Sequence, residues 1–464
     1  GQAVTTDDFL AAMSDANGFD LDQLQSWYSQ SGTPILDISG DYDEAAQEFH
    51  LHVRQSCPAT PGQPDKQPFL VPLQLGLVGP DGADMPLQLA GESHPEGASR
   101  TLLVAEREQS FAFVNLPFAP IPSLLRNFSA PVRVNFSYSR DQLAFLFAHD
   151  SDAFNRWEAG QRLATDLILE IVAGFADDRQ VEVPEAFLSA FRTSLADSQA
   201  DPAFLALALT LPAEPELGEA MIVADPVAIH AARQGVRRTL AGELNGVFKQ
   251  VMANMQSHDL YSPDPGSIGR RSLKNLCLGY LSLLEDAEIH QLCYDQYADT
   301  DNMTDRMAAL ACLVHNRLPG YPEALAAFYH RFHDDPLVVD KWFSLQATAP
   351  GPETLDHVRE LMTHPAFTMR NPNRVRSLIG AFAHGNPACF HDPSGAGYAF
   401  VADRVLELDP INPQVAARML APLSRWKRYR QRQQKLMGDQ LERIRRCAGL
   451  SNDVGEIVEK SLLN

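Results

Sequence analysis

The sequence predicts a multidomain, mainly α-helical protein in which a short helical stretch is followed by a β-sandwich and then by a large all-α, solenoid-like superhelix. Apolar and polar residues alternate with a period of two through residues 33–138. From Ser139 onwards, apolar residues recur at helical spacing. The chain has 464 residues, of which 45% are hydrophobic, which is enough for about three domains.

The first element, residues 1–38, is predicted to be helical. Thr5 and Asp8 have the spacing of a capping box in front of an apolar run, which predicts a helix over residues 5–16, and a second helical pattern ends at Tyr28. Two short helices cannot bury a core of their own. We therefore expect these helices to be the end of a larger domain cut at Gly1, and residues 1–30 to pack only weakly on the rest of the chain.

The second element, residues 39–138, is predicted to be a β-sandwich. Phe49, Leu51 and Val53 alternate with polar residues, and the same pattern recurs in about six other short segments. Seven or so short strands in about 100 residues are typical of two packed sheets. The proline-rich stretch 58–68 lies between two of these segments, which makes it a loop inside the domain.

The third element, residues 139–464, is predicted to be helical throughout. Ser139 and Gln142 have the spacing of a second capping box. Clusters of proline and glycine interrupt the helical pattern at intervals of roughly 25 to 55 residues, which favours stacked helices in an irregular superhelix, although no strict repeat is present. Such superhelices curve, so this domain could enclose or cap a ligand.

Composition excludes some partners. The formal net charge of −21 argues against nucleic acid and against electrostatic binding to an anionic membrane, since both need a basic surface. No apolar run reaches the length of about 18 residues that spans a bilayer. The six cysteines are scattered and form no CxxC motif, which favours a reducing compartment, and hence the cytoplasm, over a disulfide framework.

Catalytic motifs are few. The sequence has no HExxH motif, no GxSxG motif and no P-loop. His330 and His333 could place two metal ligands on one helix face, but no third ligand is indicated, and a solvated helix end explains them better. The basic run at residues 425–435 is interpreted as a solvated helix face, with contact to an acidic partner domain as the alternative.

Several long segments resemble the bacterial aminopeptidase N family, in the family's order and near its spacing. They are WYSQSGTPI at 27–35, DNMTDRMAAL at 301–310, DKWFSLQAT at 340–348, FTMRNPNRVRSLIGAF at 367–382, INPQVAARM at 411–419 and WKRY at 426–429. The resemblance implies a cytoplasmic, zinc-dependent metallopeptidase, a hydrolase that removes N-terminal residues from peptides. By this resemblance residues 1–38 correspond to the end of the catalytic domain, 39–138 to the β-sandwich, and 139–464 to the helical superhelix that caps the active site.

The family's HExxH zinc helix, its distal glutamate ligand, its substrate-amine loop and its oxyanion-stabilising tyrosine have no counterpart in these 464 residues. We therefore expect zinc in the intact enzyme but none in this chain, no catalytic residues in this chain, and no activity of the chain alone. The expected partners are the missing N-terminal and catalytic domains and, in the intact enzyme, peptide substrates.

The resemblance also implies that Arg376, Gln414 and Arg418 line the substrate chamber. Gln414 and Arg418 are four residues apart, which places them on one helix face. Their alternative role is to cap or pair with neighbouring helices. For the chain as a whole, the alternatives are a stand-alone helical-repeat binding or scaffold protein without enzymatic activity, and an unrelated hydrolase with an unrecognised site.

Overall fold

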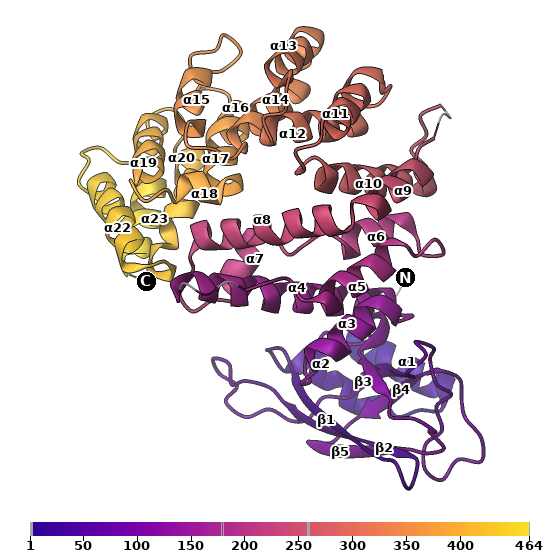
Figure 1. The fold of residues 1–464 in the computed structure, drawn as a ribbon. Coiled ribbons are helices and arrows are strands. Elements are labelled where there is room, and N and C mark those ends of the chain that lie inside the picture. Colours follow the sequence, from indigo (N-terminus) through magenta and orange to yellow (C-terminus); the bar gives the residue numbers. More distant parts are fainter. Residues whose placement is uncertain (1–2, 178, 180, 258–259, 464) are drawn as a thin grey trace. The chain divides into compact units, whose positions relative to one another are not determined.

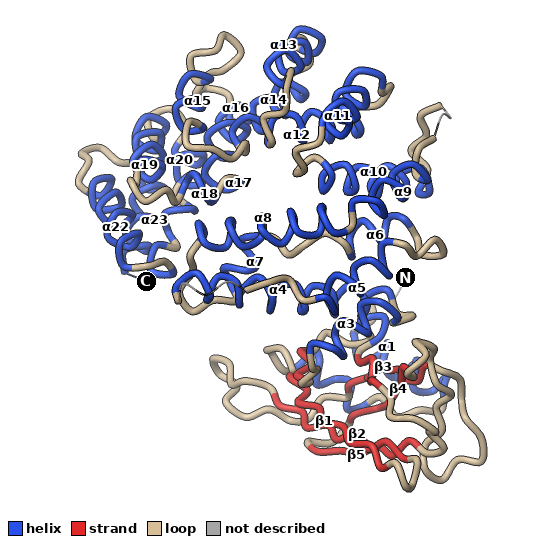
Figure 2. Tube along the Cα trace, in the orientation of Figure 1, coloured by secondary structure: helices blue, strands red, loops and turns tan. Residues whose placement is uncertain are grey.

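The computed structural model describes residues 3–177, 179, 181–257 and 260–463. Figure 1 shows the order of the elements along the chain, and Figure 2 shows which segments are helices and which are strands. The chain divides into two compact units. Unit 1 comprises Gly1–Leu163 and Glu185–Ser194, and unit 2 comprises Ala164–Pro184 and Leu195–Asn464.

Unit 1 begins with three short helices, α1 (Thr6–Asn17), η1 (Asp22–Gln25) and α2 (Ser26–Ser29). The predicted capping box of α1 is confirmed, because the Asp8 amide donates to Thr5 Oγ1 at 3.2 Å and the Thr5 amide donates to the Asp8 carboxylate at 2.8 Å. Leu10 is the buried residue of α1.

The expectation of weak packing is wrong for residues 23–31. The Trp27 ring lies 4.8 Å from that of Phe69, and its indole nitrogen donates to the Leu70 carbonyl at 2.9 Å. The Gln23 amide donates to the carbonyls of Ala105, at 2.7 Å, and Pro68, at 3.1 Å. Helical spacing alone does not reveal these partners, because they lie more than forty residues further along the chain.

The predicted β-sandwich is confirmed, but its first strand begins at Ile35 and not at residue 39, so residues 35–38 belong to the sheet and not to the helical element. Its strands are β1 (Ile35–Asp43), β2 (Glu48–Ser56), β3 (Val71–Val78), β4 (Ser99–Val104), β5 (Glu108–Phe113), β6 (Ile121–Leu124) and β7 (Arg133–Asn135). One sheet has the order β5-β2-β1-β7 and the other β4-β3-β6. β1 pairs antiparallel with β2 and parallel with β7, and the inward-facing residues, such as Leu36, Leu51 and Leu73, are fully buried in one core.

A buried ion network connects the second sheet to the helices that follow it. Arg126 lies in a segment where Leu125, Asn127 and Phe128 have positive φ angles. Its guanidinium contacts Asp84 at 2.6 Å and Asp150, at the end of α3 (Arg140–His149), at 3.2 Å. The guanidinium also fills the space over β3 where Gly76 lacks a side chain, since a Cβ there would lie 2.1 Å from the Arg126 Cζ.

The remaining helices follow in sequence. They are α4 (Ala153–Ala176), α5 (Glu185–Leu195), α6 (Pro202–Ala208), α7 (Glu214–Glu219), α8 (Pro226–Glu243), α9 (Asn245–Asn254), α10 (Pro265–Leu281), α11 (Ala287–Asp299), α12 (Met303–His315), α13 (Tyr321–Phe332), α14 (Pro336–Ala347), α15 (Thr354–Leu361), α16 (Pro372–Val375), η3 (Arg376–Gly380), α17 (Ala381–Gly385), α18 (Pro387–Phe390), α19 (Ala396–Leu408), α20 (Pro413–Met419), α21 (Ala421–Ser424), η4 (Trp426–Arg428), α22 (Gln431–Arg445) and α23 (Asn452–Leu463). Within unit 2 the helices pack on their sequence neighbours, as in a superhelix: α10 packs on α9, α11 on α12, and α22 on α23.

Proline punctuation in unit 2 marks helix starts. In seven helices an Asp or Asn side chain accepts a hydrogen bond from a backbone amide of the first turn, and the next residue is proline. This pairing is favourable because the side chain satisfies a free amide and proline has none to satisfy. The second predicted capping box, Ser139 with Gln142 at the start of α3, is also confirmed.

The first part of the run 425–435 is a turn and not the expected helix face, although Arg425 and Arg430 are exposed to solvent as expected. Arg425 and Arg428 form ion pairs with Glu219, and Arg430 pairs with Asp225 at 2.9 Å. These residues form the turn η4 and the start of α22. They connect the C-terminal helices of unit 2 to the end of α7, through Glu219, and to the start of α8, through Asp225. These pairs account for part of the positive charge without a separate acidic partner.

Replacing Arg126 by Met should lower the free energy of unfolding by about 3–5 kcal/mol, because Asp84 and Asp150 would stay buried without a cation. Urea denaturation measures the change. The control is Arg54→Met, which removes an exposed pair with Asp37 and should cost less than about 1 kcal/mol. Equal losses in the two variants would contradict this account.

The stability of the chain should fall in acid because of His391. Its ring is buried against Tyr398 and Tyr429, and burial lowers its pKa from 6.5 to about 3. The unfolded chain takes up this proton first, so the free energy of unfolding should fall as the pH drops from about 6.5 towards 3. His391→Gln should reduce that slope by about 1.4 kcal/mol per pH unit, whereas His94→Gln, at an exposed site, should not.

Candidate functional site

The three predicted site residues follow two helix N-termini in unit 2, each of which has an Asn cap followed by proline. Asn371 caps α16 by accepting from the Asn373 amide at 2.9 Å, and Pro372 follows it. Asn412 caps α20 by accepting from the Val415 amide at 3.2 Å, and Pro413 follows it. The NP dipeptide in each motif therefore sets where each helix begins, and with it the position of every later side chain.

Arg374 and Arg376 belong to one motif but have opposite surroundings. Arg374 is buried and bonds to Asp340, to the Pro336 carbonyl at 2.8 Å and to the Ala366 carbonyl at 3.0 Å. Arg376 is exposed. Among the described residues, its guanidinium donates only within its own turn, to the Pro372 carbonyl at 3.1 Å and to Asn373 Oδ1 at 2.9 Å. Arg374 holds helices together, whereas Arg376 does not.

Gln414 and Arg418 are both exposed on α20. Within the described residues, neither side chain forms a hydrogen bond or ion pair, so the expected alternative, pairing with a neighbouring helix, has no support in this structure. The exposed Arg418 guanidinium presents its forked donors to solvent, and such a fork is suited to carbonyls and to carboxylates.

The two helices that carry these residues meet. A Cβ on Gly380 would lie 3.4 Å from the Met419 side chain and 3.8 Å from the Arg376 Cβ. Arg376 therefore lies one turn before the contact and Arg418 one residue before it. Residues Arg376–Gly380 form a π-helical turn, closed by the Ala381 amide donating to the Arg376 carbonyl. Turns of this kind are often found at functional sites.

The other motifs that carry the family resemblance support the fold. In DNMTDRMAAL, Asn302 caps α12 and Asp305 pairs with buried Lys274 at 2.7 Å. In DKWFSLQAT, the Trp342 indole donates to the Leu325 carbonyl at 3.1 Å. In WKRY, the Trp426 indole donates to the Ser461 carbonyl at 2.8 Å. Arg376, Gln414 and Arg418 differ from these residues because, in the part of the chain that the structure describes, they bond to no other helix.

Sequence reasoning missed a cavity of about 890 Å³ elsewhere in unit 2, lined by residues of α9, α10 and α11 and by the segment that leads into α12. Its charged residues are spread over positions 249–305, so no short sequence motif predicts the cavity. His330 and His333 lie at the end of α13, where His333 Nδ1 is 2.8 Å from the His330 carbonyl oxygen. Outside the few undescribed positions, no three His, Cys, Asp or Glu side chains gather closely enough to hold a metal ion.

Two family models match the chain. One, a domain of unknown function described as ARM repeats (DUF3458_C), matches residues 140–463. The other, a domain of unknown function with an Ig-like fold (DUF3458), matches residues 32–137. In the described part of the chain, every helix is too short or too polar to span a bilayer.

Proteins similar to the chain include three curated relatives named aminopeptidase N. They come from Escherichia coli K12, Haemophilus influenzae and Caulobacter vibrioides and are 41%, 39% and 40% identical. Each alignment covers 100% of this chain and 52% of the relative, so the chain spans about half of their length. The crystal structure of Legionella pneumophila aminopeptidase A in complex with aspartic acid matches with a TM-score of 0.79 and 31% identity, over 99% of this chain and 52% of that one.

The neighbouring arginines give a matched stability test. Arg374→Ala should lower the free energy of unfolding by about 3–5 kcal/mol, because it removes a buried pair and leaves Asp340 without its cation. Arg376→Ala and Arg418→Ala should each change it by less than about 0.5 kcal/mol, as expected of exposed side chains. Thermal and urea unfolding measure the change in the free energy of unfolding for each of the three variants. A large loss in either exposed variant would mean that the residue is structural.

Proposed function

The chain belongs to the DUF3458_C family and matches the C-terminal half of bacterial aminopeptidase N, as its motifs predict, and we propose that it forms the non-catalytic C-terminal part of a zinc-dependent aminopeptidase. The whole protein would remove N-terminal residues from peptides. This proposal rests on the alignment with relatives named aminopeptidase N. The alignment covers all of this chain and about half the length of each relative.

In this proposal the superhelix shapes the chamber that holds the peptide, with Arg376, Gln414 and Arg418 on its lining. Their exposure and their lack of partners on other helices support the assignment. An aminopeptidase must hold the peptide beyond the bond that it cleaves. Guanidinium groups suit this task because they donate forked hydrogen bonds to backbone carbonyls and to a C-terminal carboxylate.

Zinc belongs to the catalytic half of such an enzyme. A catalytic zinc ion needs three protein ligands. The described residues of this chain gather no such set, so they do not fit a zinc site. The partners proposed for the chain are therefore the N-terminal and catalytic domains, which would supply the metal, and the peptide substrate.

We also propose that the protein is cytoplasmic, without a nucleic-acid partner or membrane insertion. The six cysteines are free thiols, including Cys277, Cys293 and Cys312 buried in unit 2, and none forms a disulfide in the described structure. The alternative function is a stand-alone helical-repeat binding or scaffold protein. The alignment with relatives named aminopeptidase N extends over the full length of this chain, which favours the peptidase over the scaffold protein.

The purified chain should bind no stoichiometric zinc and should not hydrolyse aminoacyl anilides, because it contains no ligand set and no general base positioned by a metal. Metal analysis and a chromogenic assay test this. One equivalent of tightly held zinc together with turnover would contradict the assignment of this chain as non-catalytic.

The lining role is tested in the full-length enzyme. Arg376→Ala and Arg418→Ala should lower kcat/KM for a tripeptide by roughly 1 to 3 kcal/mol in transition-state free energy, because a charge-assisted hydrogen bond is lost. An aminoacyl anilide has no leaving-group carboxylate and should be affected less.

The control for this assay is Arg432→Ala, which removes an exposed arginine on α22 and should leave both substrates unaffected. If the tripeptide and the anilide lose activity equally in the Arg376 and Arg418 variants, the lining role is wrong.

A further inference from the structure

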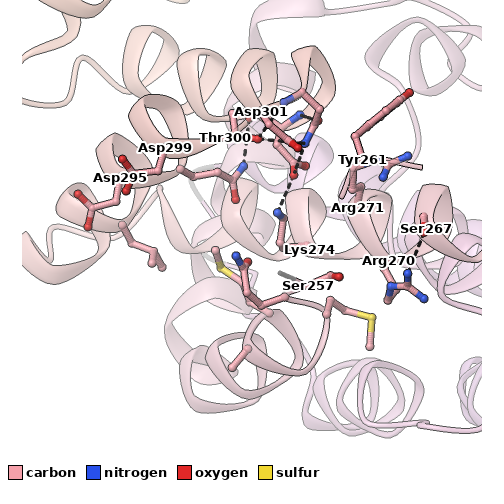
Figure 3. A pocket seen from close by; sticks show the side chains of 18 of the residues that line it. Ser257, Tyr261, Ser267, Arg270, Arg271, Lys274, Asp295, Asp299, Thr300 and Asp301 are labelled. Atoms are coloured by element: carbon pink, nitrogen blue, oxygen red, sulfur yellow. Dashed lines mark hydrogen bonds and ion pairs between the residues drawn. The ribbon is translucent and has the colours of Figure 1, made fainter. Parts of the chain in front are cut away.

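The cavity between α9, α10 and α11 has walls of opposite charge. Figure 3 shows Asp295 and Asp299 on one side of Lys274, and Ser267, Arg270 and Arg271 on the other. The cavity volume of about 890 Å³ lies within the range of about 300–1,000 Å³ that is typical of small-molecule sites.

The cationic wall comes from one helix. Arg270, Arg271 and Lys274 all lie on α10 and line the cavity. Arg270 donates to Ser267 Oγ at 2.8 Å, and Arg271 donates to the Ser262 carbonyl at 2.8 Å while its guanidinium lies 4.8 Å from the Tyr261 ring centre. Within the described residues, neither arginine forms an ion pair. The Asp264 carboxylate does lie near Arg270, since a Cβ on Gly266 would be 3.3 Å from Asp264 Oδ1 and 3.8 Å from an Arg270 nitrogen.

Lys274 has donor capacity left. Its buried ammonium makes one hydrogen bond to the described residues, to Asp305 at 2.7 Å, and an ammonium has three donors. Asp305 also accepts from Asn275 at 2.8 Å, which fixes the carboxylate in place. The Lys274 ammonium is therefore held by a fixed carboxylate and can donate a hydrogen bond to a further oxygen.

The acidic wall comes from the next helix. Glu288, Asp295 and Asp299 lie on one face of α11, with Leu292 between them. Glu288 lies 3.9 Å from the Lys249 ammonium, whereas Asp295 and Asp299 have no cation partner within the described residues. Two like charges four residues apart on a helix repel each other, so a bound cation would relieve this repulsion.

The cavity between these walls also has an apolar part. Met252 of α9 and Met255, the residue that follows α9, line this part, together with Ile289 and Leu292 of α11. Leu292 exposes 37% of its surface, which is high for a leucine at the wall of a cavity. Removing such surface from water favours a ligand with apolar side chains.

We propose that this cavity binds a short apolar peptide with free termini, with its ammonium group at Asp295 and Asp299 and its carboxylate at Arg270 and Arg271. A simple anion would leave the acidic wall unused, and a simple cation would leave the arginines unused. Nucleic acid would be repelled by the acidic wall. Only the ligand class, a peptide, rests on the proposed function.

Calorimetry on the chain alone tests the proposal, with the tripeptide alanyl-leucyl-leucine as the probe. The free tripeptide should bind, and N-acetylation or C-amidation should each weaken binding about tenfold, because each removes one charge-assisted contact. Hydrogen exchange should slow within residues 265–305. No binding at millimolar peptide, or slowed exchange only elsewhere, would overturn the proposal.

Paired variants assign each end of the peptide. In Asp295→Asn with Asp299→Asn, N-acetylation should no longer matter, while C-amidation still should; Arg270→Gln with Arg271→Gln should show the reverse. Asp65→Asn and Arg432→Gln, at exposed sites elsewhere, should behave as wild type.

If the arginine variant fails to fold, the comparison of capped and free peptides on the wild-type chain still decides the question. Equal affinity for all three peptides would contradict the proposal. Because the assay involves no hydrolysis, failure here leaves the proposed aminopeptidase role untouched. Failure of that role would remove the argument for a peptide as the ligand class, but peptide binding measured on the chain would still stand.

Discussion

Arg126 carries its guanidinium into a site where only 3% of the side chain is exposed, and two carboxylates, Asp84 and Asp150, meet it there. Burial raises the pKa of Asp150 above its usual range, and one of its buried oxygens has no partner among the described residues, so the network is stable only while the cation is present. Gly76 leaves the space that the guanidinium fills. The second sheet of the sandwich and the end of α3 are both held by this one side chain.

The same constraint recurs in unit 2, where Lys274 pairs with Asp305 and Arg374 with Asp340. A buried cation without a carboxylate would be costly. Because this chain has many carboxylates, an arginine that pairs with none of them is a candidate for binding a ligand. Arg374 and Arg376 are two residues apart, yet only the first is paired. That contrast, rather than exposure alone, is why we propose that Arg376 and Arg418 contact a ligand.

Local signals in the sequence predicted much of this structure. The capping boxes at Thr5 and Ser139 depend on residues three apart, and the strand pattern depends on alternation within one segment. The motifs that identify the family are also local, although most of their polar residues support packing. Predictions failed where the partner is distant: Trp27 packs on Phe69, and Arg428 pairs with Glu219. The charged cavity is lined by residues from three helices, so the sequence of any one helix does not predict it.

The central proposal is that this chain is about half of a larger peptidase. The intact mass of the protein in its source cells tests this proposal most directly. An antibody against the chain should recover a protein of about twice 51.2 kDa, because the chain covers 52% of its relatives. Its peptides should include an HExxH segment before Gly1. Recovery of a 51.2 kDa protein alone, with no such segment, would contradict the account.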